Sequence, residues 1–214
     1  MGLRRFAPPT RLYAWLFLAG LMLQGGSLWL RGTYDVLTFK TWALSAVSRG
    51  VFEAYSPPAG DAAPPAAFPF MAPDYPPLAV SILAGAAHVA LWLDPDLGVR
   101  SRTLTILVKA PVLAARLAAF AVVLWVAVLL MNDPRRGWAA ALVMWLNPAL
   151  ALNGPALGYL DPLCWAPGLL AVALAWGHRP VLAGGLIAVT CAVKPQGIFY
   201  ILPTAAALWR HRGH

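Results

Sequence analysis

The sequence predicts an all-α membrane protein with several bilayer-crossing helices, and three observations lead to this class. Of the 214 residues, 60% are hydrophobic and only 11% are charged, whereas a soluble domain has about 25% charged residues. The mean hydropathy is +0.68. Apolar blocks recur from Tyr13 almost to the C-terminus. We therefore expect one membrane domain over residues 1–214, built as a helix bundle with about six spans.

The first span is predicted over residues 12–30, after a cytoplasmic tail over residues 1–11. Arg4, Arg5 and Arg11 precede the apolar run, as basic residues precede the apolar part of a signal peptide. The run is about 18 residues long, which is long for a signal peptide and sufficient for a transmembrane helix. We therefore expect a helix that is retained in the protein.

The remaining spans are predicted between residues 104 and 209, and a short cytoplasmic tail follows over residues 210–214. The candidate segments are 104–131, 138–152, 163–176, 181–193 and 198–209. All but the first are short, roughly 12 to 15 residues where an isolated span needs about 20. Short segments can cross a membrane where neighbouring protein or a water-filled cavity covers their ends.

The apolar stretch over residues 77–93 decides the topology, because it sets the side of every later loop. Cytoplasmic loops carry an excess of Lys and Arg. If residues 77–93 do not cross, every short basic loop falls on the cytoplasmic side with the N-terminus; these loops hold Arg135, Arg136, Arg179, Arg210 and Arg212. If they do cross, the same residues face outward. We therefore predict a juxtamembrane or re-entrant helix over 77–93, inside an outer loop over residues 31–103.

The outer loop is predicted to hold a second surface helix and a proline-rich connection. In residues 38–49 apolar side chains recur at spacings of three and four, and Gly50 is a suitable stop. Residues 56–70 are rich in proline and predict an irregular loop. Seven of the eight acids then lie outside, with Asp133 the exception. The net charge of +8 is thus an orientation signal that suits anionic inner-leaflet lipid, and no nucleic-acid partner is expected.

Two acids of the predicted outer face are candidates for chemistry, and each also has a purely structural interpretation. Asp35 follows the first span, and it either caps the helix over residues 38–49 or acts as a general base at the membrane surface. Asp161 lies in GYLDP (158–162). It either caps the helix that begins at residue 163 or presents its carboxylate to a cavity.

Two further outer motifs combine polar groups with proline. In PDYPPL (73–78), the diproline either starts a helix and does nothing more, or fixes Asp74 and Tyr75 beside Asp35. In KPQG (194–197), Lys194 is either an ordinary interfacial lysine or a cation that faces an anionic headgroup, with Gln196 beside it.

Lys109 and Arg116 lie inside the predicted span over residues 104–131, seven residues apart on one helix face. A charge within a span costs about 2.5–3.5 kcal/mol on insertion scales, so both are functional candidates. Lys109 is close enough to the outer end to reach the interface, whereas Arg116 needs a partner or a polar cavity. His88 has no evident partner in its apolar stretch, and we assign it a structural or interfacial role.

The sequence gives little support for a metal centre. No HxxxH, HExxH or CxxC spacing occurs. The two cysteines, Cys164 and Cys191, lie in apolar segments, so no disulfide framework is implied. Asp35 and Asp161 could share a hard divalent cation, and this possible cofactor is left open.

Four motifs taken together resemble the GT-C superfamily of integral-membrane glycosyltransferases, which use polyprenyl-phosphate sugars. The motifs are YDVLTFKTWALSAVSRGVFEAY, DYPPL, NPALALNGPALGYLDPL and GGLIAVTCAVKPQGIFYILP. The likeness covers residues 12–203 and is greatest to bacterial mannosyl- or glucosyltransferase-like members and to dolichyl-phosphate-glucose-dependent glucosyltransferases. It implies that Asp35 is the catalytic base, and that Tyr75, Asp161, Lys194 and Gln196 belong to family motifs. Tyr159 departs from the pattern, because Gln or His is commoner at its position.

The resemblance implies sugar transfer at the outer face of a bacterial plasma membrane, with the N-terminus cytoplasmic. The donor phosphate would meet Lys194, with Lys109 or Arg116 as further cations, and the acceptor would be a lipid-linked glycan or another envelope molecule. Family members run to about twice this length, so the likeness is to their N-terminal module. Two alternatives stay open. One is a fragment or partner that needs a second membrane chain to supply a C-terminal half. The other is a transporter, which would be expected to carry inverted repeats and paired broken helices.

Overall fold

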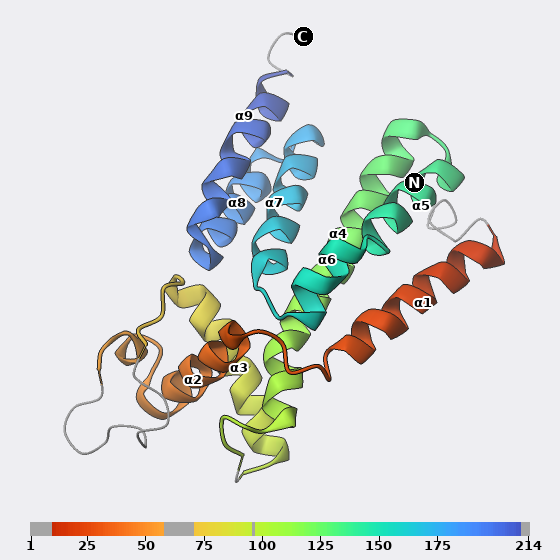
Figure 1. The fold of residues 1–214 in the computed structure, drawn as a ribbon. Coiled ribbons are helices and arrows are strands. Elements are labelled where there is room, and N and C mark those ends of the chain that lie inside the picture. The colour runs from red at the N-terminus through yellow and green to blue at the C-terminus, as the bar shows by residue number, and fades with distance from the viewer. Residues whose placement is uncertain (1–9, 58–70, 96, 211–214) are drawn as a thin grey trace.

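The computed structural model describes residues 10–57, 71–95 and 97–210, and within these ranges the chain is helical with no β-strand (Figure 1). The predicted all-α class is therefore confirmed. Most of the predicted cytoplasmic tails, 1–11 and 210–214, and of the proline-rich loop over 56–70 lies outside the described residues.

From α3 to α9 the helices follow one another with short connections, whereas 21 residues separate η2 from α3. Their bounds are α1 Arg11–Ser27, α2 Tyr34–Arg49, η2 Glu53–Tyr55, α3 Pro77–Leu93, α4 Arg102–Met131, α5 Pro134–Trp145, α6 Pro148–Ala151, η4 Leu152–Ala156, α7 Asp161–Trp176, α8 Pro180–Val193, η5 Pro195–Tyr200 and α9 Ile201–Trp209. Proline stands in the first turn of α3, α5, α6, α7 and α8. It suits that position because the first amide groups of a helix have no partner within it.

Three predicted segments differ from the observed helices. The first helix ends at Ser27 rather than at residue 30, and α2 begins at Tyr34 rather than at residue 38. The segment predicted over 138–152 is broken: α5 ends at Trp145, and the Asn147 side chain accepts from the amides of Ala149 and Leu150 to start α6. A turn of π-helix, η4, follows and leads to α7.

The long helix α4 organises the fold, because its two halves belong to different hydrophobic cores. Its first part contributes Leu104, Val108 and Val112 to a core with Phe39 and Trp42 of α2 and Leu83 and Ala87 of α3. Its second part contributes Phe120, Leu124 and Val128 to a core with Trp138 and Trp145 of α5 and with Phe17 of α1. Figure 1 accordingly shows α2 and α3 beside one end of α4, and α1 with α5 beside the other part.

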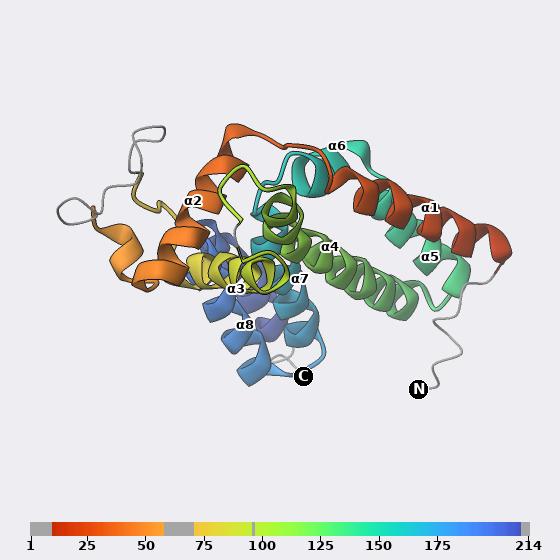
Figure 2. The same ribbon diagram turned by 90° about the horizontal axis from the view of Figure 1, so that it is seen from below.

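A third group of helices, α7 to α9, packs against α4 through α7. Seen from below, α3 lies beside α4 and close to α7 and α8 (Figure 2). The packing within this group is close, since a side chain added at Gly168 of α7 would meet the Tyr200 ring at 2.6 Å.

Among the described helices, α4 is the one that is long and apolar enough to cross a membrane, judged by length and composition. The helices α3, α7 and α8 are apolar but shorter. Large apolar side chains are exposed on several helices, among them Trp15, Met22, Trp92, Val181 and Leu202. The chain is thus a helical protein with one helix that could span a membrane, and the six predicted spans go beyond this finding.

Candidate functional site

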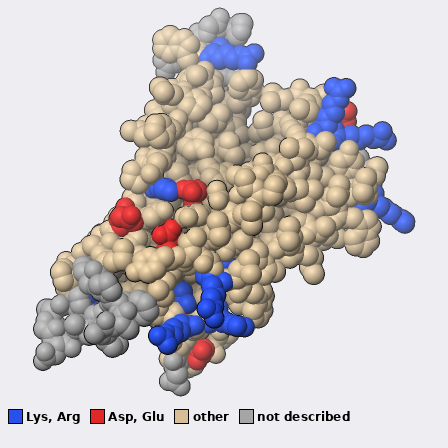
Figure 3. Space-filling view, in the orientation of Figure 1, with Lys and Arg blue, Asp and Glu red and all other residues tan. Residues whose placement is uncertain are grey.

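Residues from three distant parts of the sequence meet where α3 begins, α7 begins and α8 ends. The ammonium group of Lys194 pairs with the Asp161 carboxylate and lies 5.3 Å from the centroid of the Tyr75 ring. Asp74 precedes Tyr75 and is exposed. We call Asp74, Tyr75, Asp161 and Lys194 the Tyr75 cluster. Figure 3 shows acidic side chains grouped with a cation on the visible face of the molecule.

The Tyr75 side of the cluster is held by aromatic packing and by two hydrogen bonds to the main chain. The Tyr75 ring packs edge-on against Phe39, with 5.7 Å between centroids. The Trp42 indole donates to the Met71 carbonyl at 2.7 Å, and the Tyr55 hydroxyl donates to the Tyr75 carbonyl at 2.5 Å. The prolines that follow fix the start of α3. Tyr75 is therefore anchored to α2.

The other side of the cluster is formed by two helix ends. Lys194 has an extended backbone after α8, as expected for a residue before proline, which disfavours the helical conformation. Asp161 is the first residue of α7, and the cap position is occupied by Leu160. The structural interpretation of Asp161 as the cap is therefore wrong. Its carboxylate is instead paired with Lys194, although the Asp161 side chain remains 49% exposed.

The cluster keeps Lys194 positively charged. Burial acts to lower the pKa of Lys194, but the Asp161 hydrogen bond and the nearby Tyr75 and Asp161 outweigh burial and raise the pKa above its usual value. For Tyr75, burial raises the pKa, and Lys194 offsets only part of the effect. At neutral pH the cluster therefore presents an ammonium group beside a neutral phenol.

Asp35 lies in the first turn of α2 and is half-buried. The cap of α2 is Thr33, so the interpretation of Asp35 as the cap of this helix is wrong. An acid in the first turn instead stabilises the helix through its negative charge, which lies near the positive end of the helix dipole. Phe39, which packs on Tyr75, is four residues further along α2 and so on the same helix face as Asp35. Asp35 therefore lies one helical turn from a residue that contacts the cluster.

The start of α2 is also tied to the segment that leads into α7. The amide group of Thr33 donates to the Leu157 carbonyl at 3.0 Å. Gly158 has a positive φ of 86°, and a side chain there would collide with Val36. The Asp35 carboxylate forms no hydrogen bond or ion pair with another described residue. Its carboxylate is therefore available for a ligand.

Gln196 and the predicted intramembrane cations do not join the cluster. Gln196 is exposed in η5. Lys109 is completely buried and donates to the carbonyl groups of Ser27, Leu30 and Ala156 at 2.9–3.1 Å. The structure thus uses Lys109 to join the end of α1, the η4 turn and α4.

Arg116 is also completely buried, and its main partner was missed by sequence reasoning. It donates to the Gln24 side chain at 2.5 Å and to the Trp145 carbonyl at 3.0 Å. Gln24 in turn donates to the same carbonyl. The available signal was a glutamine inside a predicted span, where a polar side chain needs a partner. The Arg116 Nη1 atom has no partner among the described residues.

The described residues include no group of three or more His, Cys, Asp or Glu that could hold a metal ion. A cation shared by Asp35 and Asp161 stays a prediction. Cys164 and Cys191 are free thiols, and His88 is exposed on α3.

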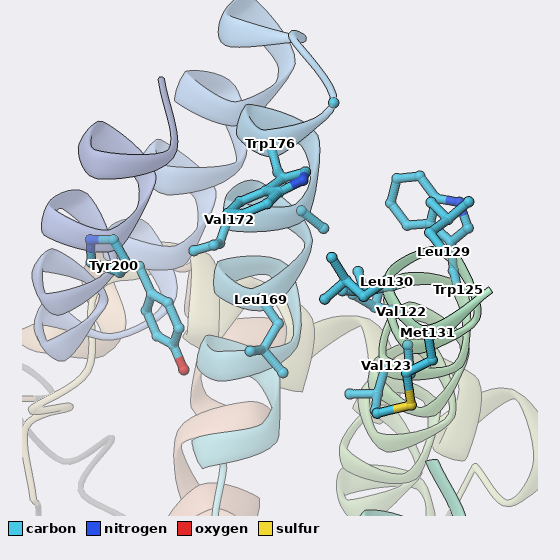
Figure 4. Close-up of a pocket in the computed structure, with 15 residues that line it drawn as sticks. Val122, Val123, Trp125, Leu129, Leu130, Met131, Leu169, Val172, Trp176 and Tyr200 are labelled. Carbon is cyan, nitrogen blue, oxygen red and sulfur yellow. The ribbon is translucent and has the colours of Figure 1, made fainter. Parts of the chain in front are cut away.

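An apolar pocket of about 640 Å³ lies between the second half of α4 and the helices α7 and η5. Figure 4 shows Leu130, Leu169, Trp176 and Tyr200 among the side chains that line it. Leu169 is eight residues along α7 from Asp161, which corresponds to about 12 Å of helix. The pocket therefore begins about 12 Å along α7 from Asp161 and extends from there towards Trp176.

The pairing of Asp161 with Lys194 predicts a small but measurable coupling. In a double-mutant cycle of Asp161→Asn and Lys194→Met, we expect the free energy of unfolding to show a coupling of about 1 kcal/mol, because the carboxylate is half exposed. Chemical unfolding in an uncharged detergent measures it. Strictly additive effects of the two substitutions would contradict the ion pair.

Comparisons of the chain with protein-family models, with curated proteins and with solved structures found no match.

Proposed function

We propose that this protein transfers a sugar from a polyprenyl-phosphate donor to a hydroxyl group of a lipid-linked or envelope acceptor at the outer membrane face. The observation that supports the proposal is the Tyr75 cluster, in which a lysine lies between two acids, together with an apolar pocket that begins about 12 Å further along α7. Asp35 stands one turn from Phe39, which contacts the cluster. The donor phosphate requires a cation, and the reacting hydroxyl group requires a carboxylate that can accept its proton. The lipid chain requires an apolar groove.

The reaction assigns a separate task to each group. Asp35 accepts the proton of the acceptor hydroxyl as the oxygen attacks the anomeric carbon with inversion. The bond between that carbon and the phosphate oxygen breaks, and the phosphate leaves with the electron pair. Lys194 stabilises the negative charge that develops on the phosphate. Asp161 holds Lys194 in place while the site is empty, and the incoming phosphate shares its ammonium group.

The apolar pocket is proposed to accept the first part of the polyprenyl chain. Its lining is aliphatic and aromatic, and Tyr200 of η5 is one of the lining residues. A chain seated along α7 would place its phosphate towards Asp161 and Lys194.

The topology that this reaction needs is six spans, with α2 and α3 outside the membrane. The two cores of α4 support it. The helix α3 packs against Leu104, Val108 and Val112, whereas residues 112–131 of α4 have the length of about 30 Å that a bilayer core requires. In this arrangement the Tyr75 cluster and Asp35 share the outer side, and Arg135, Arg136 and Arg179 lie in the cytoplasm.

Cysteine labelling tests this topology directly. With Cys164 and Cys191 replaced by serine, we expect single cysteines at positions 35 and 161 to react with an impermeant maleimide added to whole cells. Cysteines at positions 136 and 179 should react after the membrane is opened. Position 35 reacting from one side and position 161 from the other would rule out a shared site.

A second candidate function is that of a membrane subunit that acts only with another chain. It is favoured by the same apolar pocket, which is open between α4 and α7 and could equally seat a helix of a partner.

One experiment separates the two functions. The purified chain is placed in vesicles with a radiolabelled polyprenyl-phosphate sugar, and release of polyprenyl phosphate is measured. Turnover by the chain alone supports the enzyme. Turnover only after a membrane protein encoded beside it is added supports the subunit, and no turnover with either removes the proposed reaction.

A further inference from the structure

A second pocket, which is polar, lies at the start of α2 and of α4. It has a volume of about 710 Å³ and is formed by the α1–α2 connection, the start of α2, the α3–α4 connection and the start of α4. Its charged lining residues are Arg31, Lys40, Arg100 and Arg102, and no acid is among the residues that line it. We call it the cationic pocket. Figure 3 shows Lys and Arg side chains gathered on the visible face near the connection between α3 and α4.

Lys40 is the most informative residue of the cationic pocket, because it is a buried charge that forms no ion pair with any residue the structure describes. Lys40 is only 5% exposed. The ammonium group donates to the Ser101 carbonyl at 3.0 Å and to the Thr105 hydroxyl at 2.9 Å. An ammonium group has three donors, so one remains for a ligand. Burial lowers the pKa of Lys40, which is the cost that a bound anion would offset.

The cationic pocket is separate from the proposed catalytic site. Lys40 and Asp35 are five residues apart on α2, and at 100° per residue their side chains are about 140° apart around the helix. Lys40 faces the start of α4, through Ser101 and Thr105. Asp35 shares the face of Phe39, which packs on Tyr75.

Two further features favour an anion in this pocket. The pocket lies at the amino-terminal ends of both α2 and α4, and helix amino termini carry partial positive charge. Its rim includes Trp29, which is 66% exposed, and Tyr34, which is also exposed. Exposed aromatic side chains beside arginines are typical of the level of lipid headgroups.

We propose that the cationic pocket binds the phosphate group of an anionic phospholipid. The buried Lys40 supplies a fixed hydrogen-bond donor, and Arg31, Arg100 and Arg102 supply the surrounding charge. Trp29 lies at the rim, where the glycerol and the first part of the acyl chains would leave the pocket. The proposal depends on no step of the sugar transfer, and its test measures binding rather than turnover.

The test uses the full chain in nanodiscs that contain equal amounts of phosphatidylcholine and phosphatidylglycerol. After extraction into an uncharged detergent, the lipids retained by the protein are measured by native mass spectrometry. The variants are Lys40→Met and the double variant Arg100→Gln/Arg102→Gln, whose side chains are exposed and do not stabilise the core. The control is Arg49→Gln at the other end of α2, which removes one positive charge outside the pocket.

We expect the natural chain and Arg49→Gln to retain phosphatidylglycerol in preference to phosphatidylcholine. Both pocket variants should lose this preference about tenfold, because each loses hydrogen bonds to a charged group. If Lys40→Met does not fold, the double variant decides. Equal retention by the double variant and by Arg49→Gln would overturn the proposal. A melting temperature raised by inorganic phosphate, but not by chloride of equal ionic strength, without retained lipid would overturn the lipid as the source.

Discussion

Replacement of Asp35 by asparagine is expected to lower the rate of sugar transfer by about 10²- to 10⁴-fold, the usual contribution of a general base. The amide has nearly the shape of the carboxylate but cannot accept the proton of the acceptor hydroxyl. The Asp35 side chain forms no hydrogen bond or ion pair with another described residue. The substitution therefore removes no contact within the described structure, and expression and melting temperature should stay close to those of the natural chain.

The matched control is Asp94→Asn. Asp94 follows the end of α3, and its main chain, rather than its carboxylate, makes the hydrogen bonds of that turn. We expect this variant to keep full activity in the vesicle assay. Full turnover by Asp35→Asn would remove the base assignment, whereas loss of activity in both variants would point to a general need for outer acids.

The sequence predicts helix limits best where neighbouring residues, such as proline at the start or a charged residue after the end, determine them. The apolar run over 77–93 coincides with α3, because the prolines fix its start and Asp94 follows its end. The break at Asn147 was missed, although Asn-Pro is a common start of a helix, because the apolar pattern runs through it. Local rules place helix ends well when polar and apolar signals agree, and they fail where a helix is interrupted inside an apolar run.

The candidate site could be predicted only in part, for a related reason. The prediction that Tyr75, Asp161 and Lys194 face one side followed from the charge of the loops, and in the structure these residues meet. The partners of Lys109 and Arg116 could not be predicted, since they are main-chain carbonyls and a glutamine from distant segments. The cationic pocket likewise depends on the packing of α2 against α4, which no single stretch of sequence encodes.

The largest effect on stability is expected from Lys109→Met. The methionine fills a similar volume but leaves the Ala156 carbonyl group buried without the donor that Lys109 supplies, and the partly buried Leu30 carbonyl loses the same donor. The Ser27 carbonyl loses less, because it also accepts from the Leu30 amide. A buried acceptor without a partner costs about 1–3 kcal/mol. The burial of an ammonium group is relieved at the same time and offsets part of this cost, so we expect a net loss of about 2 kcal/mol in the free energy of unfolding.

Arg135→Met is the matched control, because it removes one positive charge from an exposed position of α5, outside the cationic pocket. Its effect should stay within about 0.5 kcal/mol, as for most surface substitutions. Chemical unfolding in an uncharged detergent measures both variants, and the vesicle assay distinguishes the two roles considered for Lys109. If Lys109 joins α1, η4 and α4, the folded fraction of Lys109→Met keeps the KM of the natural chain for the polyprenyl-phosphate donor. If Lys109 binds the donor phosphate, KM rises while stability is unchanged, and the structural role is wrong.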